Sequence, residues 1–448
     1  MKQENFTEGN ILKQLMAFST PILLANLLQV SFQLIDSLWV GNLLGAEALG
    51  AVTVSGTIIF TVLSFIIGIN NAALTILSQL KGKEDDRGLK RYVNAFIVLL
   101  TAISAVLGLS GFLLAEQILL LLGTPSSMVN EAAGYLKINF AGIFFLFGYN
   151  FIGTVLRSLG NSKAPVRFVL AAVILNTVID PLFISIFGLG VDGAAYATVL
   201  SQGLAFIYGF IYSRRHELVP FSLPKLPARE EVTLILKLGI PAGLQMMVIS
   251  AGTAAIMSVV TSFGSGTVAG FGAAQRLDSL LMLPAHALGT AVNSMAGQNI
   301  GVRDWSRVHR IALFGVLYNL SIMLLVAVLI FSFGEWGVKL FIQEQEAVAF
   351  GSAYLITIAF FYPFLGINFI LNGIVRASGA MVQVLVLNII SLWILRYPFT
   401  YWFSAIFGEK GIALGMGASF VISSIVAFLY YRFGKWDKKK IFQEETSA

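Results

Sequence analysis

Long apolar stretches, separated by short polar segments, run through the whole chain. Twelve of them are about 20 residues long or longer, which is the length that a helix needs to cross the hydrocarbon core of a membrane. They show no strict alternation of polar and apolar residues, and they are too long for the strands of an outer-membrane barrel. The pattern therefore predicts an all-α integral membrane protein with twelve transmembrane helices, at 15–38, 51–80, 92–114, 129–156, 164–187, 193–213, 232–262, 268–300, 308–333, 347–376, 382–407 and 412–433.

The two halves of the sequence repeat each other at an offset of 219 residues, which is the separation of Gln79 and Gln298. The repeat keeps its order over the predicted spans, and each half is too long to be one unit of a solenoid. Transporters built from two like helical bundles have this arrangement, so we expect two pseudo-symmetric six-helix lobes. Further pairs at this offset are Gly45 and Gly264, Ala72 and Ala291, Gly82 and Gly301, Asp85 and Asp304, Arg91 and Arg310, Arg157 and Arg376, and Gly160 and Gly379.

A polar stretch that contains Pro220, Pro224 and Pro227 separates the two halves. It is the only long polar segment in the middle of the chain. We therefore expect an N-terminal lobe at 1–213, a cytoplasmic linker at 214–231 and a C-terminal lobe with a basic tail at 232–448. With an even number of spans in each lobe, the two bundles have parallel orientations and leave a cavity for a substrate between them.

The composition agrees with a lipid environment. Hydrophobic residues make up 57% of the chain and charged residues 12%, with a mean hydropathy of +0.83, which exceeds the apolar share of ordinary soluble domains. There is no cysteine, so disulfides, thiol catalysis and cysteine metal sites are excluded. The first ten residues are polar and include acidic residues, so we expect no cleaved signal peptide.

Lysine and arginine residues gather after every second predicted span. They follow the second, fourth, sixth and eighth spans and fill the tail, and Lys339 and Lys410 are the clear exceptions. Cytoplasmic loops of membrane proteins carry an excess of basic residues. We therefore expect both termini to be cytoplasmic and the net charge of +6 to reflect membrane topology, with no nucleic-acid partner. The basic tail at 438–440 is expected to lie near anionic lipid headgroups.

A polar stripe on the first span contains one of the few intramembrane acids. Asn26, Gln29, Gln33 and Asp36 are three or four residues apart, so they share one face of a helix. A carboxylate near the bilayer centre costs about 2.5–3.5 kcal/mol on insertion scales, which makes such a residue a functional candidate. The alternative is that Asp36 lies at the membrane interface near Trp39, where water reaches it.

The fifth span contains the second acid, Asp180. Asn176 lies one turn earlier on the same face, and Pro181 follows and removes a backbone donor. Asp180 has a structural interpretation, in which it forms a hydrogen bond between helices, and a functional one. In the functional interpretation, Asp36, Asn176, Asp180 and the hydroxyl of Thr198 converge in one bundle and hold protons, or a sodium ion through oxygen ligands.

The second half has a different set of charges. At an offset of 220, Asp36 falls on Ile256, Asn176 on Arg396 and Asp180 on Thr400, so no acid replaces either one. The second half instead contains Arg276 and Asp278, which are two residues apart and do not face each other on a helix. For these two, as for the lone His286, we weigh a packing role against a role in coupling. Asn368 and Asn372 lie one turn apart in the tenth span.

Four methionines gather on the seventh and eighth spans, at Met246, Met247, Met257 and Met282. Thioethers and aromatic rings make adaptable apolar surfaces, which suit a site that accepts ligands of many shapes. The alternative for each methionine is ordinary packing in the core or against lipid. We predict a substrate-binding set of Asp36, Gln33, Gln29, Met246, Met257, Met282 and Asn372, and we predict no catalytic residue and no metal site.

Taken together, the motifs resemble those of the multidrug and toxic compound extrusion (MATE) family, in its DinF-type prokaryotic branch. The resemblance covers essentially the whole chain. It depends on the order of several short motifs: Pro21 and Pro241, Val-Gly-Asn at 40–42, Ser-Gln at 78–79 and Gly-Gln at 297–298, Arg-Ser-Leu-Gly at 157–160 and Arg-Ala-Ser-Gly at 376–379, and Gly-Val-Asp-Gly-Ala-Ala-Tyr-Ala-Thr at 190–198.

The resemblance implies two six-helix lobes, a V-shaped cavity and export of cationic, amphipathic compounds in exchange for protons or sodium. It implies a monomer in the inner membrane of a prokaryote that needs no cofactor besides the coupling ion. It further implies that cation coupling belongs to Asp36, Asn176, Asp180, Thr198 and Tyr135. Some members carry acids in the seventh and tenth spans, where this sequence has Gln245 and Asn372, so a sodium site in the C-terminal lobe is not expected.

We hypothesise that Asp36 alternates between a protonated and an ionised form. Ionised, it helps to hold a cationic substrate; protonated from outside, it releases the substrate and rearranges the first, fifth and sixth spans. Sodium coupling through the same residues is one alternative. A lipid-linked glycan flippase is another, although Arg276 and Arg396 are few cations for a pyrophosphate. An intramembrane enzyme would need a catalytic motif, and the sequence contains neither an HExxH motif nor a supported Ser–Lys pair.

Overall fold

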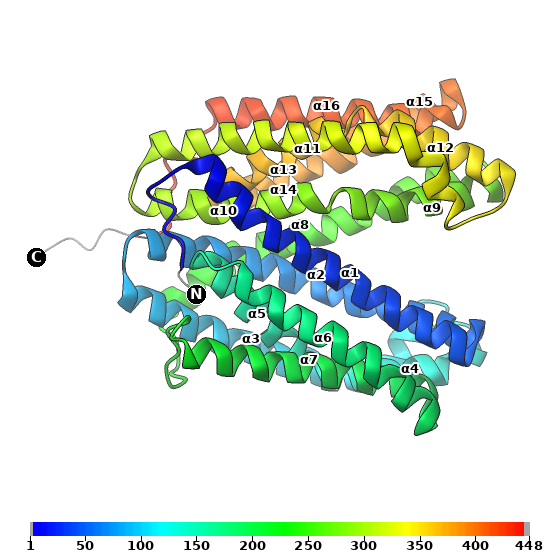
Figure 1. The fold of residues 1–448 in the computed structure, drawn as a ribbon, viewed down its shortest axis with the longest axis horizontal. Helices are drawn as coiled ribbons and strands as arrows, with labels where there is room; N and C mark the ends of the chain where they lie inside the picture. The colour runs from blue at the N-terminus through cyan, green and yellow to red at the C-terminus, as the bar shows by residue number, and fades with distance from the viewer. Residues whose placement is uncertain (1–2, 443–448) are drawn as a thin grey trace, which may run out of the picture. The chain divides into compact units, whose positions relative to one another are not determined.

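The computed structural model describes residues 3–442, which form helices and no strand (Figure 1). The expected all-α fold is therefore confirmed. The elements are α1 (Ile11–Leu44), α2 (Ala46–Gly82), α3 (Asp86–Leu121), α4 (Ser126–Ala141), α5 (Ile143–Ser158), α6 (Lys163–Pro181), η1 (Leu182–Ile186), α7 (Gly190–Arg215), α8 (Arg229–Thr261), α9 (Ser265–Leu281), α10 (Leu283–Gly301), α11 (Trp305–Lys339), α12 (Gln345–Ala359), α13 (Tyr362–Ala377), α14 (Met381–Ile389), η2 (Ile390–Arg396), α15 (Tyr397–Phe407) and α16 (Lys410–Phe433), with η marking π-helical turns.

Several of the expected spans are bent or broken. Within residues 3–442, nine helical segments are long and apolar enough to cross a membrane, and two bent pairs raise the number to eleven. The pairs are α4 with α5, bent by 51°, and α12 with α13, bent by 55°. The expected span at 268–300 is divided at Met282 into α9 and α10, because Pro284 in the first turn of α10 lacks a backbone donor.

The repeat extends to the backbone conformation. Gly45 and Gly264 have φ angles of 91° and 102°, and Gly160 and Gly379 have φ angles of 82° and 86°. These angles are in the region that favours glycine, because a Cβ atom is disfavoured there. The α3 and α11 helices also begin alike, since the carboxylates of Asp85 and Asp304 each accept a hydrogen bond from the backbone three residues later, at 2.8 Å.

By their contacts, residues 3–442 divide into two compact units. Unit 1 consists of residues 3–5 and 24–237, and unit 2 consists of residues 6–23 and 238–442. The first part of α1 thus belongs to the unit that contains most of the second repeat. The first nine residues of α8 belong to the unit that contains most of the first repeat. The lobe and linker boundaries expected from the sequence stay a prediction.

In unit 2, the leading segment before α1 is held by an arginine of α11. The Arg307 guanidinium donates to the carbonyl oxygens of Phe6 at 2.8 Å, Glu8 at 2.6 Å and Gly9 at 3.0 Å. The Phe6 ring is fully buried and contacts the Phe18 ring edge-on, with centroids 4.8 Å apart. These contacts join the start of α1 to an apolar cluster formed with α10, α11 and α13.

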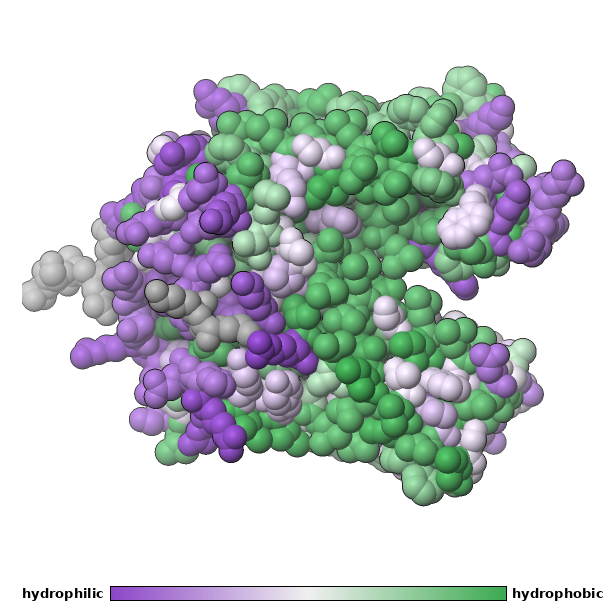
Figure 2. Space-filling view, viewed as in Figure 1, coloured by the Kyte–Doolittle hydropathy of each residue, from purple (hydrophilic) through white to green (hydrophobic). Residues whose placement is uncertain are grey.

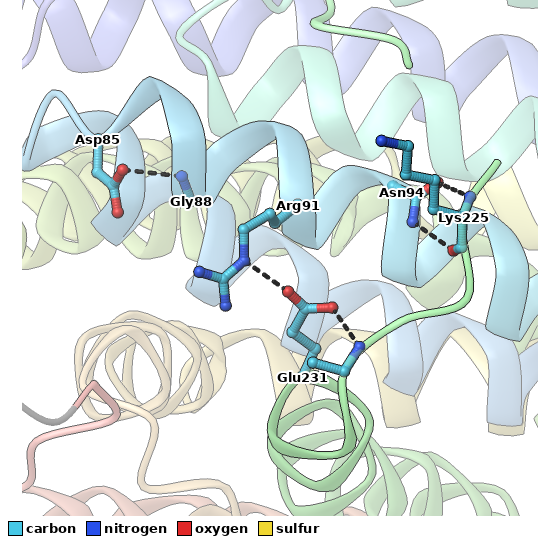
Figure 3. A network of polar contacts seen from close by, with 7 residues as sticks. Asp85, Gly88, Arg91, Asn94, Lys225 and Glu231 are labelled. Atoms are coloured by element: carbon cyan, nitrogen blue, oxygen red, sulfur yellow. Dashed lines mark hydrogen bonds and ion pairs between the residues drawn. The ribbon is translucent and has the colours of Figure 1, made fainter. Parts of the chain in front are cut away.

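In unit 1, the segment before α8 lies along α3 (Figure 3). Asn94 donates to the backbone oxygen of Lys225 at 2.8 Å and accepts from its backbone nitrogen at 3.0 Å. Arg91 donates to Glu231 at 2.7 Å, and Glu231 in turn accepts from the backbone nitrogen of Ala228 at 2.9 Å. The last part of the expected linker is therefore anchored at both its backbone and its side chains.

The surface of unit 1 separates hydrophilic from apolar residues. Figure 2 shows hydrophilic residues gathered at the end that carries the α2 to α3 connection and the segment after α7. Large apolar side chains are exposed along the sides of the helices, as at Leu109 and Leu113 of α3, which are 65% and 62% exposed. Such a surface suits lipid contact along the helices and water contact at their ends.

Candidate functional site

The centre of the site in unit 1 is the carboxyl group of Asp36 on α1. One of its oxygens accepts a hydrogen bond from the hydroxyl of Tyr135 on α4 at 3.4 Å, and the other accepts from the hydroxyl of Thr198 on α7 at 3.3 Å. The Asp36 side chain is 7% exposed. Three helices from distant parts of the sequence thus bring these three residues together, as expected from the sequence.

Asp36 lies well inside its helix. The α1 helix continues for two turns beyond it, to Leu44, and Trp39 packs against an apolar cluster with α2, α4 and α7. The burial of Asp36 therefore disagrees with the interpretation in which it is hydrated at the membrane interface. Among residues 3–442, no lysine, arginine or histidine forms an ion pair with Asp36.

The second acid of unit 1 is fully buried on α6. Asn176 donates to one oxygen of Asp180 at 3.0 Å, and both side chains have no exposed surface. Pro181 ends α6, and the π-helical turn η1 follows directly. The other Asp180 oxygen and the Asn176 oxygen have no hydrogen-bond partner within the described chain. An unpartnered buried oxygen is costly, so this pair has spare capacity for a proton or a cation.

The two carboxylates belong to one electrostatic site. Asp36 and Asp180 are close enough to repel each other when both are ionised, and Tyr135 interacts with both. A proton or another cation at either carboxyl reduces this repulsion. The structure therefore brings together all five residues of the expected cation-coupling set, Asp36, Asp180, Asn176, Thr198 and Tyr135. Their role in coupling stays a prediction.

The other predicted site residues do not contact this set through any recorded hydrogen bond. On α1, Gln29 and Gln33 are exposed, whereas Asp36 is buried. Met257 and Met282 belong to an apolar cluster of unit 2, which is the packing role that the sequence left open. Met246 on α8 is half-buried. Their role in substrate binding stays a prediction.

Asn372 is paired inside its own helix, because it donates to the side-chain oxygen of Asn368 one turn earlier on α13. Both amides are buried. His286, whose role the sequence left open, is packed against the Phe369 ring with centroids 4.3 Å apart.

The structure also reveals a group that the sequence interpretation missed. In unit 2, Asp278 on α9 accepts hydrogen bonds from the hydroxyls of Tyr354 on α12 and Tyr362 on α13. From the sequence alone, Asp278 was a candidate residue but neither tyrosine was. The repeat itself contains the missing signal, because Tyr354 lies 219 residues after Tyr135, the tyrosine that donates to Asp36.

Comparison with known proteins places this geometry in a family. The MatE family model matches the chain twice, at residues 21–182 and 241–402. The chain belongs to the MATE family. The two matches are offset by 220 residues, which confirms the duplication inferred from the sequence.

Two relatives of this MATE protein come from Bacillus subtilis (strain 168). The probable multidrug resistance protein YpnP is 64% identical over 99% of this chain and 100% of the relative. The probable multidrug resistance protein YoeA is 30% identical over 97% of this chain and 96% of the relative. Both alignments extend over essentially the whole length of each protein.

Solved structures show the same fold. An outward-facing structure of a multidrug resistance MATE family transporter of the MOP superfamily matches 98% of this chain and 100% of its own, with a TM-score of 0.91 at 23% identity. A mutant of the Vibrio cholerae MATE transporter VcmN matches 97% of this chain and 99% of its own, also with a TM-score of 0.91 at 23% identity. The expected twelve-helix membrane fold is confirmed, and the family is one of membrane transporters.

Proposed function

We propose that this MATE protein is a secondary active multidrug antiporter that exports cationic amphipathic compounds in exchange for protons. The observation that carries the proposal is Asp36, a buried carboxyl in a membrane-length helix that is hydrogen-bonded by two uncharged hydroxyls. An acid without a cationic partner is costly in the membrane, so a proton or a bound cation must neutralise it at some point. The names of the Bacillus relatives support drug-like substrates.

In this mechanism the ionised Asp36 attracts a cationic substrate from the cytoplasmic side. A proton from outside then neutralises the carboxyl and weakens its hold on the substrate. The change alters the hydrogen bonds from Tyr135 and Thr198, so it alters the packing of α1 against α4 and α7 within unit 1. Asp180 contributes because the two carboxylates repel each other when both are ionised, and Pro181 with η1 makes the end of α6 easier to deform.

The driving force is sufficient for modest concentration gradients. One unit of pH difference supplies about 1.4 kcal/mol per proton. A membrane potential of about 100 mV supplies about 2.3 kcal/mol for each charge moved. A free energy of about 1.4 kcal/mol corresponds to a tenfold concentration ratio.

Two other functions share the fold. Sodium coupling would use the same oxygen atoms, because carboxylates, amides and hydroxyls also bind hard cations. A flippase for lipid-linked glycans would need several cations around a pyrophosphate, and the side chains of Arg276 and Arg396 instead lie over the aromatic rings of Phe341 and Phe420. The geometry therefore supports drug export over lipid flipping, and we propose the proton as the coupling ion.

The proposal includes a location and an assembly state. We place the protein in the inner membrane of a prokaryotic cell as a multi-pass monomer of the DinF-type branch, with both termini cytoplasmic. The basic residues near 81–91 and 214–229 support this orientation, because the α2 to α3 connection and the segment after α7 lie at the same end of unit 1 (Figure 1). No enzymatic activity and no cofactor besides the coupling ion are proposed.

Everted membrane vesicles that contain the wild-type protein test the coupling ion. Ethidium uptake is measured first with a pH gradient, acid inside, in sodium-free buffer, and then with a sodium gradient at equal pH on both sides. We expect uptake with the pH gradient alone. Uptake that requires sodium would support the sodium alternative, and no uptake with either gradient would contradict drug antiport. Binding of a lipid-linked pyrophosphate without any dye transport would favour the flippase.

A further inference from the structure

In unit 2, a carboxyl group lies at the junction of two broken spans. Asp278 is near the end of α9, where the chain breaks at Met282 before α10 begins. One Asp278 oxygen accepts from the Tyr354 hydroxyl at 3.4 Å, and the other accepts from the Tyr362 hydroxyl. These tyrosines come from α12 and α13, the two halves of the span that is bent by 55°. The hydrogen bonds of Asp278 therefore connect the end of α9, next to the break before α10, with both sides of the bend between α12 and α13.

This group repeats the chemistry of unit 1 in a different place. Tyr135 donates to Asp36, and Tyr354, its counterpart at an offset of 219, donates to Asp278. The counterpart of Asp36 is Ile256, which is 2% exposed in an apolar cluster. The second repeat thus keeps the tyrosine but carries the acid on its second span instead of its first. Within residues 3–442, each unit thus has a carboxyl group that accepts a hydrogen bond from a tyrosine.

The Asp278 carboxyl has no cationic partner within residues 3–442, since no ion pair there includes it. The neighbouring Arg276 is exposed, and its guanidinium lies 5.8 Å from the centre of the Phe341 ring. The Arg396 guanidinium lies 4.6 Å from the centre of the Phe420 ring. Since an unpaired carboxylate in a membrane is costly, a cation from outside the chain would stabilise it.

The surroundings of Asp278 favour a large organic cation over a metal ion. The Tyr354 ring contacts the Phe271 ring edge-on, with centroids 5.1 Å apart, and the Tyr354 hydroxyl lies 3.6 Å from the Met416 sulfur. Aromatic faces and thioethers attract soft, weakly hydrated cations. Both tyrosine hydroxyls donate to the carboxyl group, and sodium would need oxygen lone pairs there.

Exposure determines whether a ligand can reach the group. The two tyrosines are only 2% and 1% exposed, whereas the Asp278 residue as a whole is half-buried, so a ligand would approach the group from the α9 side. We propose that Asp278, positioned by Tyr354 and Tyr362, is a substrate-binding carboxylate in unit 2 that holds the positive charge of an organic cation. The inference rests on the proposed export of organic cations and adds a site to it.

The test is equilibrium binding of radiolabelled tetraphenylphosphonium to the purified full-length protein in lipid nanodiscs at a fixed alkaline pH. Asp278→Asn keeps the shape of the side chain but removes its charge, and we expect it to weaken binding about tenfold, which is the effect of about 1.4 kcal/mol. Glu335→Gln is the matched control, because it removes an exposed carboxylate of unit 2 that pairs with Lys339, and we expect no change.

Two further variants distinguish the loss of the charge from a disturbed fold. Asp278→Glu keeps the charge, and we expect its affinity to stay within about threefold of that of the wild type. Tyr362→Phe keeps the ring but loses one donor to Asp278, and we expect a smaller loss than for Asp278→Asn. Loss of binding in Asp278→Glu to the same degree as in Asp278→Asn would indicate a disturbed fold and would overturn the charge-based account.

The outcomes separate this inference from the proposed function. If Asp278→Asn binds the cation as well as the wild type does, the inference is wrong while proton-coupled export stands. If Asp278→Asn retains affinity at this pH, and the same assay repeated over a pH series shows that it has lost the pH dependence of the wild type, the carboxyl is a proton carrier and the inference is also wrong. If the wild type does not bind the cation at all, both the inference and the proposed substrate class are contradicted.

Discussion

At the scale of single residues, the proposed function depends on carboxyl groups that the chain buries without a cation. Asp36 and Asp180 could be identified from the sequence because an acid in a long apolar stretch is conspicuous. Helical spacing placed Asn176 one turn before Asp180, whereas only the family resemblance pointed to Tyr135, and the structure brings both to the same group. The pairing of Asp278 with Tyr354 and Tyr362 was missed, because those residues are 76 and 84 positions away and no local pattern connects them.

Another single residue, Glu231, combines two stabilising roles. It pairs with Arg91 of α3, and it accepts from the backbone of Ala228 at the start of α8 (Figure 3). The Glu231 side chain is 5% exposed and that of Arg91 is 58% exposed. The backbone contact is the reciprocal half of a capping box, so Glu231 stabilises the helix start independently of the ion pair.

We therefore expect unequal effects from truncating the two partners. Glu231→Ala should lower the free energy of unfolding by about 1–2 kcal/mol, because it removes the cap as well as the ion pair. Arg91→Ala should cost less than about 1 kcal/mol, as exposed ion pairs do. The measurement is thermal unfolding of the purified protein, with the exposed Glu230→Ala as control. Equal losses for the Glu231 and Arg91 variants would contradict a capping role.

At the scale of elements, hydropathy predicts where helices lie but not where they bend. The expected helix at 129–156 is one apolar run, yet the structure divides it at Gly142 into α4 and α5. The expected helix at 347–376 is divided in the same way. Apolar side chains continue across both bends, so the pattern carries no sign of them. Local signals come only from prolines, at Pro284 in the first turn of α10 and at Pro363 in the first turn of α13.

Close helix contacts depend on small residues at particular positions. Helices α9 and α12 approach each other at Gly270 and Gly351, where a Cβ atom on Gly351 would come within 2.8 Å of the Gly270 backbone oxygen. A Cβ atom on Gly270 would overlap the backbone oxygen of Ala347. Small residues at such positions allow membrane helices to pack closely, since little hydrophobic driving force acts between helices in lipid.

A matched pair of substitutions on α9 tests this contact. Gly270→Val should destabilise the protein by about 1–3 kcal/mol, because the added atoms meet backbone that cannot move aside. Gly272→Val changes the helix propensity equally but meets open space, so it should have little effect beyond that propensity. Thermal unfolding of the two variants in the same detergent gives the comparison. Similar melting temperatures would contradict the close contact.

At the scale of the whole molecule, the duplication explains the helical scaffold but not the positions of the acidic residues. The repeated glycine angles and helix caps belong to both halves, and the family model matches both. The acids do not follow the repeat, because Asp36 has no acidic counterpart and Asp278 falls on Ile59 of the first half. The contact-based units also depart from the simple division into halves, since residues 6–23 group with the second repeat.

The orientation of the whole molecule is directly measurable. The chain contains no cysteine, so a single introduced cysteine reports one position without interference. Lys83→Cys should react with a membrane-impermeant maleimide only from the cytoplasmic side, because it lies among the basic residues after α2. Lys339→Cys, at the end of α11, should react only from outside. The reverse labelling of the two positions would contradict cytoplasmic termini.

The central claim is that Asp36 carries the proton that drives export. The most direct measurement is proton movement during ethidium transport in proteoliposomes, followed with an internal pH indicator. Asp36→Asn keeps the size of the side chain but cannot exchange a proton, so we expect its proton movement to fall to the protein-free background. Glu47→Gln, which changes an exposed acid of α2, should behave as the wild type. Proton-coupled transport that persists unchanged in Asp36→Asn would contradict the account.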